Sequence, residues 1–222
     1  MSPVLSILVL IALIAVYGYC LPRFIAKKYY SFTNLIFAAI TVGYALLAGA
    51  SLEDLGLRLP RAGVLVTIVI VSFLAIYTYS HLHRNRLKLT ASSRYELLVR
   101  IPFGTALSEE LVFRSSLLGL LLHSYSRLAS IAVSSVVFGL WHLLPGPLQS
   151  WAHGQLDETL LPRWAKSSIS NSSTVLFTAI GGVIFALSRL VGGTILLPWS
   201  IHSSTNIIGW LTTRENNQKG KL

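Results

Sequence analysis

The amino-acid sequence predicts an all-α protein, a polytopic bundle of about seven transmembrane helices. Hydrophobic residues occupy 53% of the 222 positions, whereas charged residues occupy only 12%. Because a soluble domain usually carries about 25% charged residues, this chain has too few of them to cover a water-soluble globule. Apolar stretches long enough to cross a bilayer as a helix, about 20 residues each, recur along its whole length.

Seven segments are predicted to span the membrane. In chain order they are residues 3–20, 33–50, 62–80, 101–122, 128–144, 173–190 and 194–211. The first is interpreted as a retained span and not as a cleaved signal peptide, because its basic residues, Arg23, Lys27 and Lys28, follow the apolar stretch instead of preceding it. The fourth is the least apolar, since it contains three charged residues.

The basic residues predict the orientation of the bundle. A net charge of +10 would indicate nucleic-acid binding in a soluble protein, but here Lys and Arg lie mainly between the apolar stretches. They concentrate in alternate connections; residues 81–100, for example, hold Arg84, Arg86, Lys88, Arg94 and Arg100. The positive-inside rule then predicts an outer N-terminus and a cytoplasmic C-terminus. The expected partner of these residues is the lipid bilayer and not a nucleic acid.

Residues 145–172 form the longest connection between predicted spans. Pro145, Gly146 and Pro147 end the helix before it, and Trp151 and Trp164 are typical of a membrane interface. An interfacial loop is expected here, with a lid over an active site as the alternative.

Six polar residues inside the predicted spans carry the functional signal, because an ionisable side chain near the bilayer centre costs about 2.5–3.5 kcal/mol or more. They are Glu109, Glu110, Arg114, His142, His202 and Asn206. In the predicted orientation all of them fall in the inner half of the bilayer. Their three spans could therefore converge on one water-accessible cavity.

The spacing of these residues separates a structural pair from a reactive set. Glu110 and Arg114 are four residues apart on one helix and are predicted to form an ion pair. Glu109 points about 100° away from Glu110 and is left free for chemistry. His202 and Asn206 also differ by four positions, so both donors share one helix face.

This combination suits amide hydrolysis without a Ser or Cys nucleophile. Glu109 in an apolar bundle is a suitable base, and with His142 it could deprotonate a bound water. His202 and Asn206 would then donate hydrogen bonds to the developing oxyanion. The chain has no Gly-x-Ser-x-Gly or His-Glu-x-x-His motif, and no Asp lies inside a predicted span, which excludes an aspartyl pair of the presenilin type.

A zinc site is the alternative interpretation of the same residues. Glu109, His142 and His202 could bind zinc and leave a coordination position for water. Asn206 is a poor zinc ligand but a good amide donor, which favours the metal-free version. Cys20 is the only cysteine, so a cysteine-rich metal site is excluded. We therefore assign no metal ligand and expect no required cofactor.

Three motifs, in order and each on its own span, resemble those of the CPBP family, the membrane proteins of CAAX proteolysis and bacteriocin processing that are also called Abi proteins. They are Glu109-Glu110-Leu-Val-Phe-Arg114 (Glu-Glu-x-x-x-Arg), Phe138-Gly-Leu-Trp-His142 (Phe-x-x-x-His) and His202-Ser-Ser-Thr-Asn206 (His-x-x-x-Asn). The resemblance covers about residues 92–211. The expected organisation is thus N-terminal transmembrane helices (1–91), a CPBP/Abi-type protease core (92–211) and a polar C-terminal tail (212–222).

The resemblance implies a CAAX-protease-like bundle of seven to eight spans, with any eighth helix in residues 145–172. It implies one set of residues that activates water and stabilises the oxyanion, and a second set that supports it. These sets are Glu109, His142, His202 and Asn206, and Glu110, Arg114 and Phe138, respectively. The resemblance leaves a metal open, because the family has been described both as metalloproteases and as glutamate-type proteases.

The predicted function is therefore an intramembrane endopeptidase that cleaves a membrane-associated peptide or protein near the cytosolic face. The small chain without extra domains suits a bacterial plasma membrane. The alternative is a non-catalytic membrane protein, such as a bacteriocin-immunity factor or a transporter component in which the buried Glu and His residues form a proton relay.

Overall fold

The computed structural model describes residues 2–60, 62–68, 70, 72, 77, 91–142 and 168–219. These residues form helices and no strand, which confirms the all-α prediction for this part of the chain. The long helices are α1 (Pro3–Phe24), α2 (Tyr30–Leu47), α7 (Arg127–Trp141), α9 (Ser168–Gly192) and α10 (Leu196–Lys219), and the short 3₁₀ helix η1 (Lys27–Tyr29) precedes α2.

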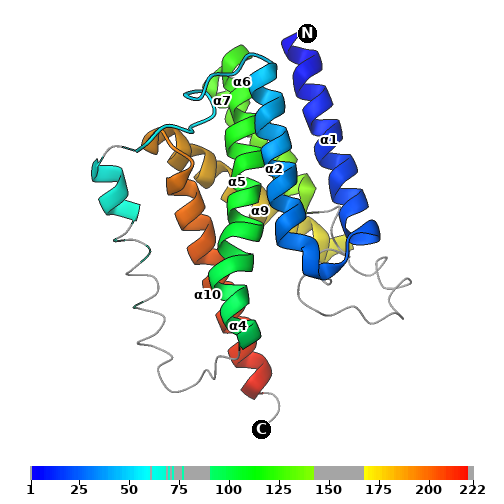
Figure 1. The fold of residues 1–222 in the computed structure, drawn as a ribbon, viewed down its shortest axis with the longest axis vertical. Helices are drawn as coiled ribbons and strands as arrows, with labels where there is room; N and C mark the ends of the chain where they lie inside the picture. The colour runs from blue at the N-terminus through cyan, green and yellow to red at the C-terminus, as the bar shows by residue number, and fades with distance from the viewer. Residues whose placement is uncertain are drawn as a thin grey trace.

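A continuous helical run, from Ala91 to Ser124, passes through the centre of the molecule and is here called the central run (Figure 1). It consists of α4 (Ala91–Tyr95), the π-helical η2 (Glu96–Leu107), α5 (Ser108–Glu110), the π-helical η3 (Leu111–Leu117) and α6 (Leu118–Ser124). Pro102 lies inside η2, where it removes one backbone donor. The short α5 lies between two π-helical segments and carries two carboxylates. Because π-helical turns are frequent at functional sites, this position favours a functional role for them.

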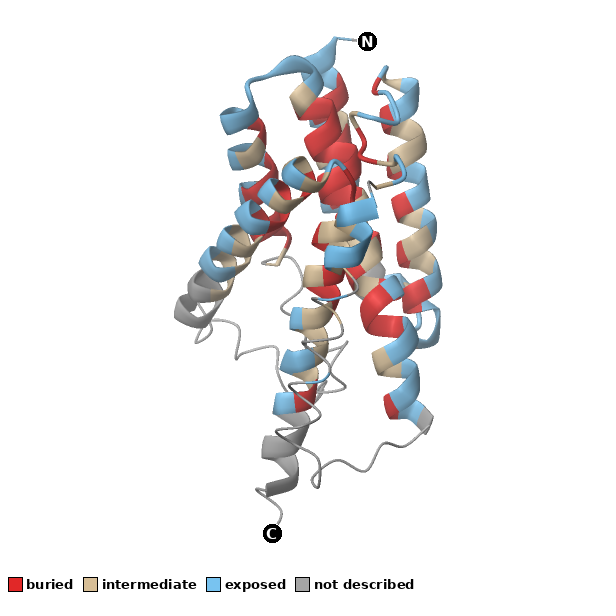
Figure 2. Cartoon of the chain, turned by 90° about the vertical axis from the view of Figure 1, so that its left-hand side faces the viewer, coloured by how far each residue is buried: buried red, intermediate tan, exposed pale blue. Residues whose placement is uncertain are grey.

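The other helices pack around the central run. Segment η2 contacts both α2 and α10, η3 contacts α2, and α7 lies along α9. Figure 2 shows the buried residues gathered on the inward faces of these helices. The core they form is apolar and includes Leu10, Ile14, Ala38, Leu55, Phe113, Leu117 and Phe138.

Apolar side chains also cover much of the outside. On α1, Leu8 is 57% exposed and Val16 is 61% exposed, although the opposite face of the same helix is buried. A soluble protein would not present such a helix to water, whereas a lipid bilayer accepts it. These exposed faces therefore agree with the predicted membrane environment.

Three helical segments in the described part of the chain are long and apolar enough to cross a membrane: Pro3–Cys20, Tyr30–Leu47 and Thr174–Gly192. They correspond to predicted spans 3–20, 33–50 and 173–190. The central run contains the predicted span 101–122, but its charged residues make it less apolar, and α7 is apolar but shorter. Predicted span 62–80 is described only in part and the connection 145–172 lies largely outside the described residues, so the total of seven to eight spans stays a prediction.

Local sequence signals explain where α7 begins and where α2 ends. Ser126 precedes α7, and its Oγ atom accepts a hydrogen bond from the Ala129 N–H, as an N-cap residue should. At the end of α2, Gly49 adopts a φ of 103°, and Ala50 N–H donates to the Ala45 carbonyl at 3.0 Å. This is the glycine-dependent turn that commonly closes a helix.

The loop after α2 is hydrogen-bonded to the C-terminal part of α9. Arg189 is 5% exposed, and its guanidinium donates to the backbone carbonyls of Glu53, at 3.0 Å, and Asp54. Gly56 leaves room for this side chain, because a Cβ atom there would lie 2.8 Å from the Arg189 Nε atom. The backbone N–H of Ile195 then donates to the Gly56 carbonyl at 3.0 Å. Together these contacts close one end of the bundle.

Candidate active site

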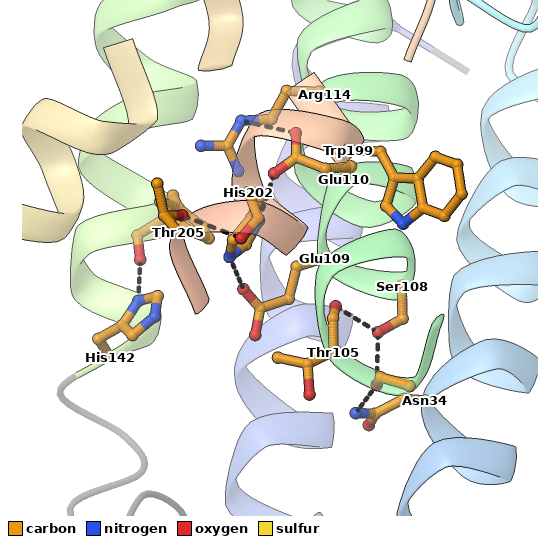
Figure 3. Close-up of polar contacts among 12 residues, drawn as sticks. Asn34, Thr105, Ser108, Glu109, Glu110, Arg114, His142, Trp199, His202 and Thr205 are labelled. Carbon is orange, nitrogen blue, oxygen red and sulfur yellow. Dashed lines mark hydrogen bonds and ion pairs between the residues drawn. The ribbon is translucent and has the colours of Figure 1, made fainter. Parts of the chain in front are cut away.

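Glu109 and Glu110 lie on α5, between the two π-helical segments of the central run. His142 follows the last residue of α7, and His202 lies near the beginning of α10. Figure 3 shows the His202 ring between the side chains of Glu109 and Glu110. The fold therefore brings the charged residues of the first and third sequence motifs into direct contact.

His202 binds Glu110 in the interior of the bundle. The distance between His202 Nδ1 and Glu110 Oε1 is 2.8 Å, and the Glu110 side chain has no exposed surface. An ionised carboxylate can only accept hydrogen bonds, so Nδ1 carries a proton and donates it to Glu110. This contact fixes the orientation of the ring and directs Nε2 to its other side.

Glu109 faces that other side of the histidine. Its Oε2 atom lies 3.7 Å from His202 Nε2, and its side chain is 14% exposed. The sequence predicts that the two adjacent carboxylates point in different directions, and they do reach His202 from different sides. Of the two, Glu109 is the one that a water molecule could reach.

The predicted ion pair between Glu110 and Arg114 is present. Arg114 Nε lies 3.5 Å from Glu110 Oε2, and both side chains are fully buried. Glu110 Oε2 and the three guanidinium nitrogens nevertheless find no hydrogen-bond partner among the described residues. Arg114 is thus held by charge and by its neighbours more than by hydrogen bonds.

Three aromatic rings also lie close to the Arg114 guanidinium. The Cζ atom of Arg114 lies 3.9 Å from the ring centre of Phe138, 5.1 Å from that of Phe185 and 6.0 Å from that of Phe113. A guanidinium over an aromatic face is stabilised by about 2 kcal/mol when both are desolvated. This explains how a cation can be kept in a dry part of the protein beside only one paired carboxylate.

Phe138 also lies against both histidines of the motifs. Its ring meets the His142 ring edge-on at 4.8 Å between centres and the His202 ring edge-on at 6.1 Å. His142 Nδ1 lies 2.8 Å from the Phe138 carbonyl oxygen, one turn earlier on α7. Since a carbonyl only accepts, Nδ1 donates to it, and Nε2 of the neutral ring is left as an acceptor.

Asn206 lies one helical turn after His202 on α10 and is half-buried. Within the described part of the chain its amide makes no hydrogen bond. The structure therefore places Asn206 one turn from the histidine on the same helix, as the spacing predicts, but shows no hydrogen bond from it to Glu109, Glu110 or His142.

A small cavity of about 20 Å³ lies next to Glu109, which is enough room for a water molecule. Its lining combines aromatic, aliphatic and polar side chains from α1, α2, α7 and the central run: Tyr17, Asn34, Phe37, Ser108, Glu109, Val112, Phe113 and Trp141. The rings of Tyr17 and Phe37 stack at 3.8 Å between centres, and that of Trp141 lies parallel to Tyr17 at 6.4 Å. Glu109 thus both approaches His202 and lines this cavity.

The sequence analysis identified Glu109 alone among these lining residues and missed its three polar neighbours, Tyr17, Asn34 and Ser108. Asn34 offers the one available signal, because a primary amide inside a predicted span must find a partner. Tyr17 and Ser108 are unremarkable in an apolar helix. Their place beside Glu109 depends on how α1 and α2 pack against the central run.

The described residues do not assemble the alternative zinc site. Nowhere in this part of the chain do three His, Cys, Asp or Glu side chains lie close enough together to hold a metal ion. Glu109 Oε2 lies 3.7 Å from His202 Nε2, but the described residues add no third such side chain to this pair. Whether the protein requires a metal stays a prediction.

Comparison with known proteins gave one family. A family model described as type II CAAX prenyl endopeptidase Rce1-like matches residues 91–208, which is more than half of the chain. The match includes all three motifs and leaves out α1 and α2. Comparisons with curated proteins and with solved structures gave no match.

Proposed function

Because the chain belongs to the Rce1-like family of type II CAAX prenyl endopeptidases, within the CPBP family, we propose that it cleaves a membrane-associated peptide inside the membrane, near the cytosolic face. It is an integral membrane protein of a protease family, and three helices in the described part of the chain are able to span a bilayer. The observation that carries the proposal is the position of His202, whose two ring nitrogens lie 2.8 Å from Glu110 and 3.7 Å from Glu109.

The charges of the buried groups support a proton shared by Glu109 and His202. Glu110 and Arg114 neutralise each other, so the remaining pair is neutral only if it holds one proton. That proton can sit on His202 beside an ionised Glu109, or on Glu109 beside a neutral His202. An unbalanced charge in this dry environment would be costly. The pair is therefore suited to accept and return a proton during a reaction.

In the proposed reaction Glu109 is the general base. A water molecule beside Glu109 loses its proton to this carboxylate while the water oxygen attacks the peptide carbonyl carbon. His142 contributes Nε2 as an acceptor that orients the same water. When the C–N bond breaks, Glu109 returns the proton to the leaving amine. The products are a new C-terminal carboxyl group, which still carries its proton, and a free amine, and no step requires a metal.

His202 and Asn206 are the proposed donors to the oxyanion. A protonated His202, oriented by Glu110 through Nδ1, presents a charged Nε2–H that stabilises negative charge on the substrate oxygen. Asn206 adds an amide N–H from the next turn of α10. Arg114 and Phe138 act as supporting residues, since Arg114 balances the Glu110 charge and Phe138 contacts Arg114 and both histidines.

The proposed substrate is a peptide held at the membrane by a lipid or an apolar segment, with access from the cytosolic side. The family description names a CAAX prenyl endopeptidase, so a quenched fluorescent peptide with a prenylated cysteine near its C-terminus is the first substrate to test. A membrane-embedded site has little use for a freely soluble peptide, because the apolar part of a substrate provides its partitioning into the bilayer.

Activity of the purified protein in lipid nanodiscs tests this proposal. We expect Glu109→Gln and His142→Ala each to lower kcat by at least about 100-fold, the usual contribution of a general base. Glu53→Gln is the matched control, because the Glu53 carboxylate pairs with Arg58 at the exposed surface and lies outside the site. Full activity of Glu109→Gln would show that the site is wrong. A wild-type protein that cleaves none of a panel of lipidated and unlipidated membrane peptides would favour the immunity or proton-relay alternative.

A further inference from the structure

Two helices outside the matched segment reach the active-site helix through one hydrogen-bonded chain of side chains. Asn34 on α2 is 7% exposed, and its Nδ2 atom donates to the Gly104 carbonyl in η2 at 2.8 Å. Tyr17 on α1 donates its hydroxyl hydrogen to Asn34 Oδ1 at 2.6 Å. This second contact identifies the oxygen of the amide, so the Asn34 nitrogen must face Gly104.

The Gly104 carbonyl is linked to the segment that carries Glu109 both by its position in the sequence and by a hydrogen bond. Ser108 donates its Oγ hydrogen to the same carbonyl at 2.9 Å, and Ser108 immediately precedes Glu109. Gly104 lies in η2, which leads directly into α5, the segment that carries Glu109. A displacement of the Gly104 peptide would therefore be transmitted to the turn that carries the general base.

The close packing at Gly104 shows that this contact is specific. A Cβ atom at position 104 would overlap the side chain of Ser31 and lie 2.9 Å from its Cα atom. Any larger residue would push α2 away from η2 and break the contact of Asn34. The absence of a side chain at Gly104 thus allows α2 to approach until its amide reaches the backbone of the active-site helix.

Resting on the proposed function, we propose that Asn34 is a positioning residue of the active site, which holds Glu109 in its reactive place through the Gly104 carbonyl, and that Tyr17 orients Asn34. Both residues also line the cavity beside Glu109. Neither needs to touch the scissile bond. Because Asn34 and Tyr17 affect the geometry of the general base, we expect their substitution to change the rate of the chemical step and not the binding of substrate.

Steady-state kinetics of variants in nanodiscs tests this inference, with the peptide that the wild-type protein cleaves. We expect Asn34→Ala to lower kcat by about 10- to 100-fold with KM within twofold of the wild type, because a small displacement of a reacting group has effects of this size. Tyr17→Phe removes one hydroxyl and should lower kcat by about 3- to 10-fold. In both variants the pH profile of kcat should change along with its magnitude, since the environment of the base changes.

Two control variants separate positioning from general packing. Tyr44→Phe removes a hydroxyl that donates from α2 to the Ser6 carbonyl on α1 at 3.0 Å, away from Glu109. Thr41→Val removes a buried hydroxyl of α2 that accepts from Ser116 at 3.2 Å. Both should keep kcat within twofold even if they lower the melting temperature as much as the Asn34 and Tyr17 variants do.

Three results would overturn the inference in distinguishable ways. If Asn34→Ala and Tyr17→Phe retain wild-type kcat while Glu109→Gln is inactive, the positioning role is wrong and the proposed function stands. If the control variants lose kcat equally, the effect belongs to helix packing. If Glu109→Gln is fully active, the proposed function is wrong and the inference, which rests on it, is wrong as well.

Discussion

His202 Nδ1 lies 2.8 Å from Glu110 Oε1, so a histidine of the third motif is oriented by a carboxylate of the first. Glu110 is fully buried and binds Arg114 through its other oxygen. A residue that the sequence assigns to structural support therefore also determines which His202 nitrogen faces Glu109. Glu110 thus both pairs with Arg114 and orients His202 for the proposed reaction.

Glu110→Gln should separate these two roles. Glutamine keeps the shape of the side chain but cannot stabilise a protonated His202 by charge. We expect kcat to fall by about 10- to 100-fold, the effect of losing a hydrogen bond between charged groups, with KM nearly unchanged. Glu96→Gln is a suitable control, because Glu96 pairs with Arg100 on the same helical run but does not contact His202. An unaltered kcat in Glu110→Gln would contradict the orienting role.

Arg114 and Glu110 should be coupled in stability. Arg114→Met removes the cation and leaves Glu110 buried beside His202, which we expect to lower the free energy of unfolding by about 3–5 kcal/mol. The double variant Glu110→Gln/Arg114→Met should recover part of this loss but no activity. Unfolding in mixed micelles, followed by circular dichroism, measures the cycle. Strictly additive effects of the two substitutions would show that the pair is not coupled.

Removal of metal should leave the activity intact. The proposed steps use water, Glu109, His142, His202 and Asn206, and the described residues present no group of three metal ligands. We expect dialysis against EDTA, followed by assay in metal-free buffer, to retain most of the wild-type kcat. Loss of activity that added Zn²⁺ restores would instead support the zinc alternative.

The loop that follows α2 should make stability depend on pH in the acidic range. The Ser51 backbone N–H donates to Asp54 Oδ2 at 2.8 Å and the Ser51 hydroxyl at 2.7 Å, and these bonds hold the pKa of Asp54 below its ordinary value. A lowered pKa means that the stabilisation is fully present above the ordinary pKa of about 3.9. It is lost as the pH falls through the lower value in the folded protein.

Asp54→Asn provides the measurement for this prediction. The variant should melt at a lower temperature than the wild type at neutral pH, and the difference should shrink when the pH falls below the ordinary pKa of Asp54. Glu53→Gln, next to it but exposed, should show a much smaller dependence. A difference in melting temperature that stays constant from neutral to strongly acidic pH would contradict the role of the Asp54 charge.

The sequence predicts the parts of this protein that depend on local pattern. Hydropathy predicted the helical class, and the four-residue spacing predicted the ion pair between Glu110 and Arg114, which the structure contains. The three motifs predicted membership of the CPBP family, which the match over residues 91–208 confirms. The roles of the individual site residues stay predictions.

The contacts made by His202 could not be predicted in the same way. Which nitrogen meets which carboxylate depends on how α10 is placed against α5, and 92 residues separate Glu110 from His202. Spacing within one helix contains no information about this placement. The hydrogen bond from Asn34 to Gly104 is a similar case, because it needs the close approach of α2 that a glycine in another helix allows.

The contact between Arg189 and the loop after α2 has a consequence for the biosynthesis of the chain. The carbonyl groups of Glu53 and Asp54 leave the ribosome before Arg189 has been translated, since 135 or more residues separate the partners. The first two helices must therefore enter the membrane before these hydrogen bonds can form, while the two carbonyls are bound to water. The hydrogen bonds can form only after α9 has been synthesised. A nascent chain that stops before α9 consequently lacks the guanidinium donor for these two carbonyls.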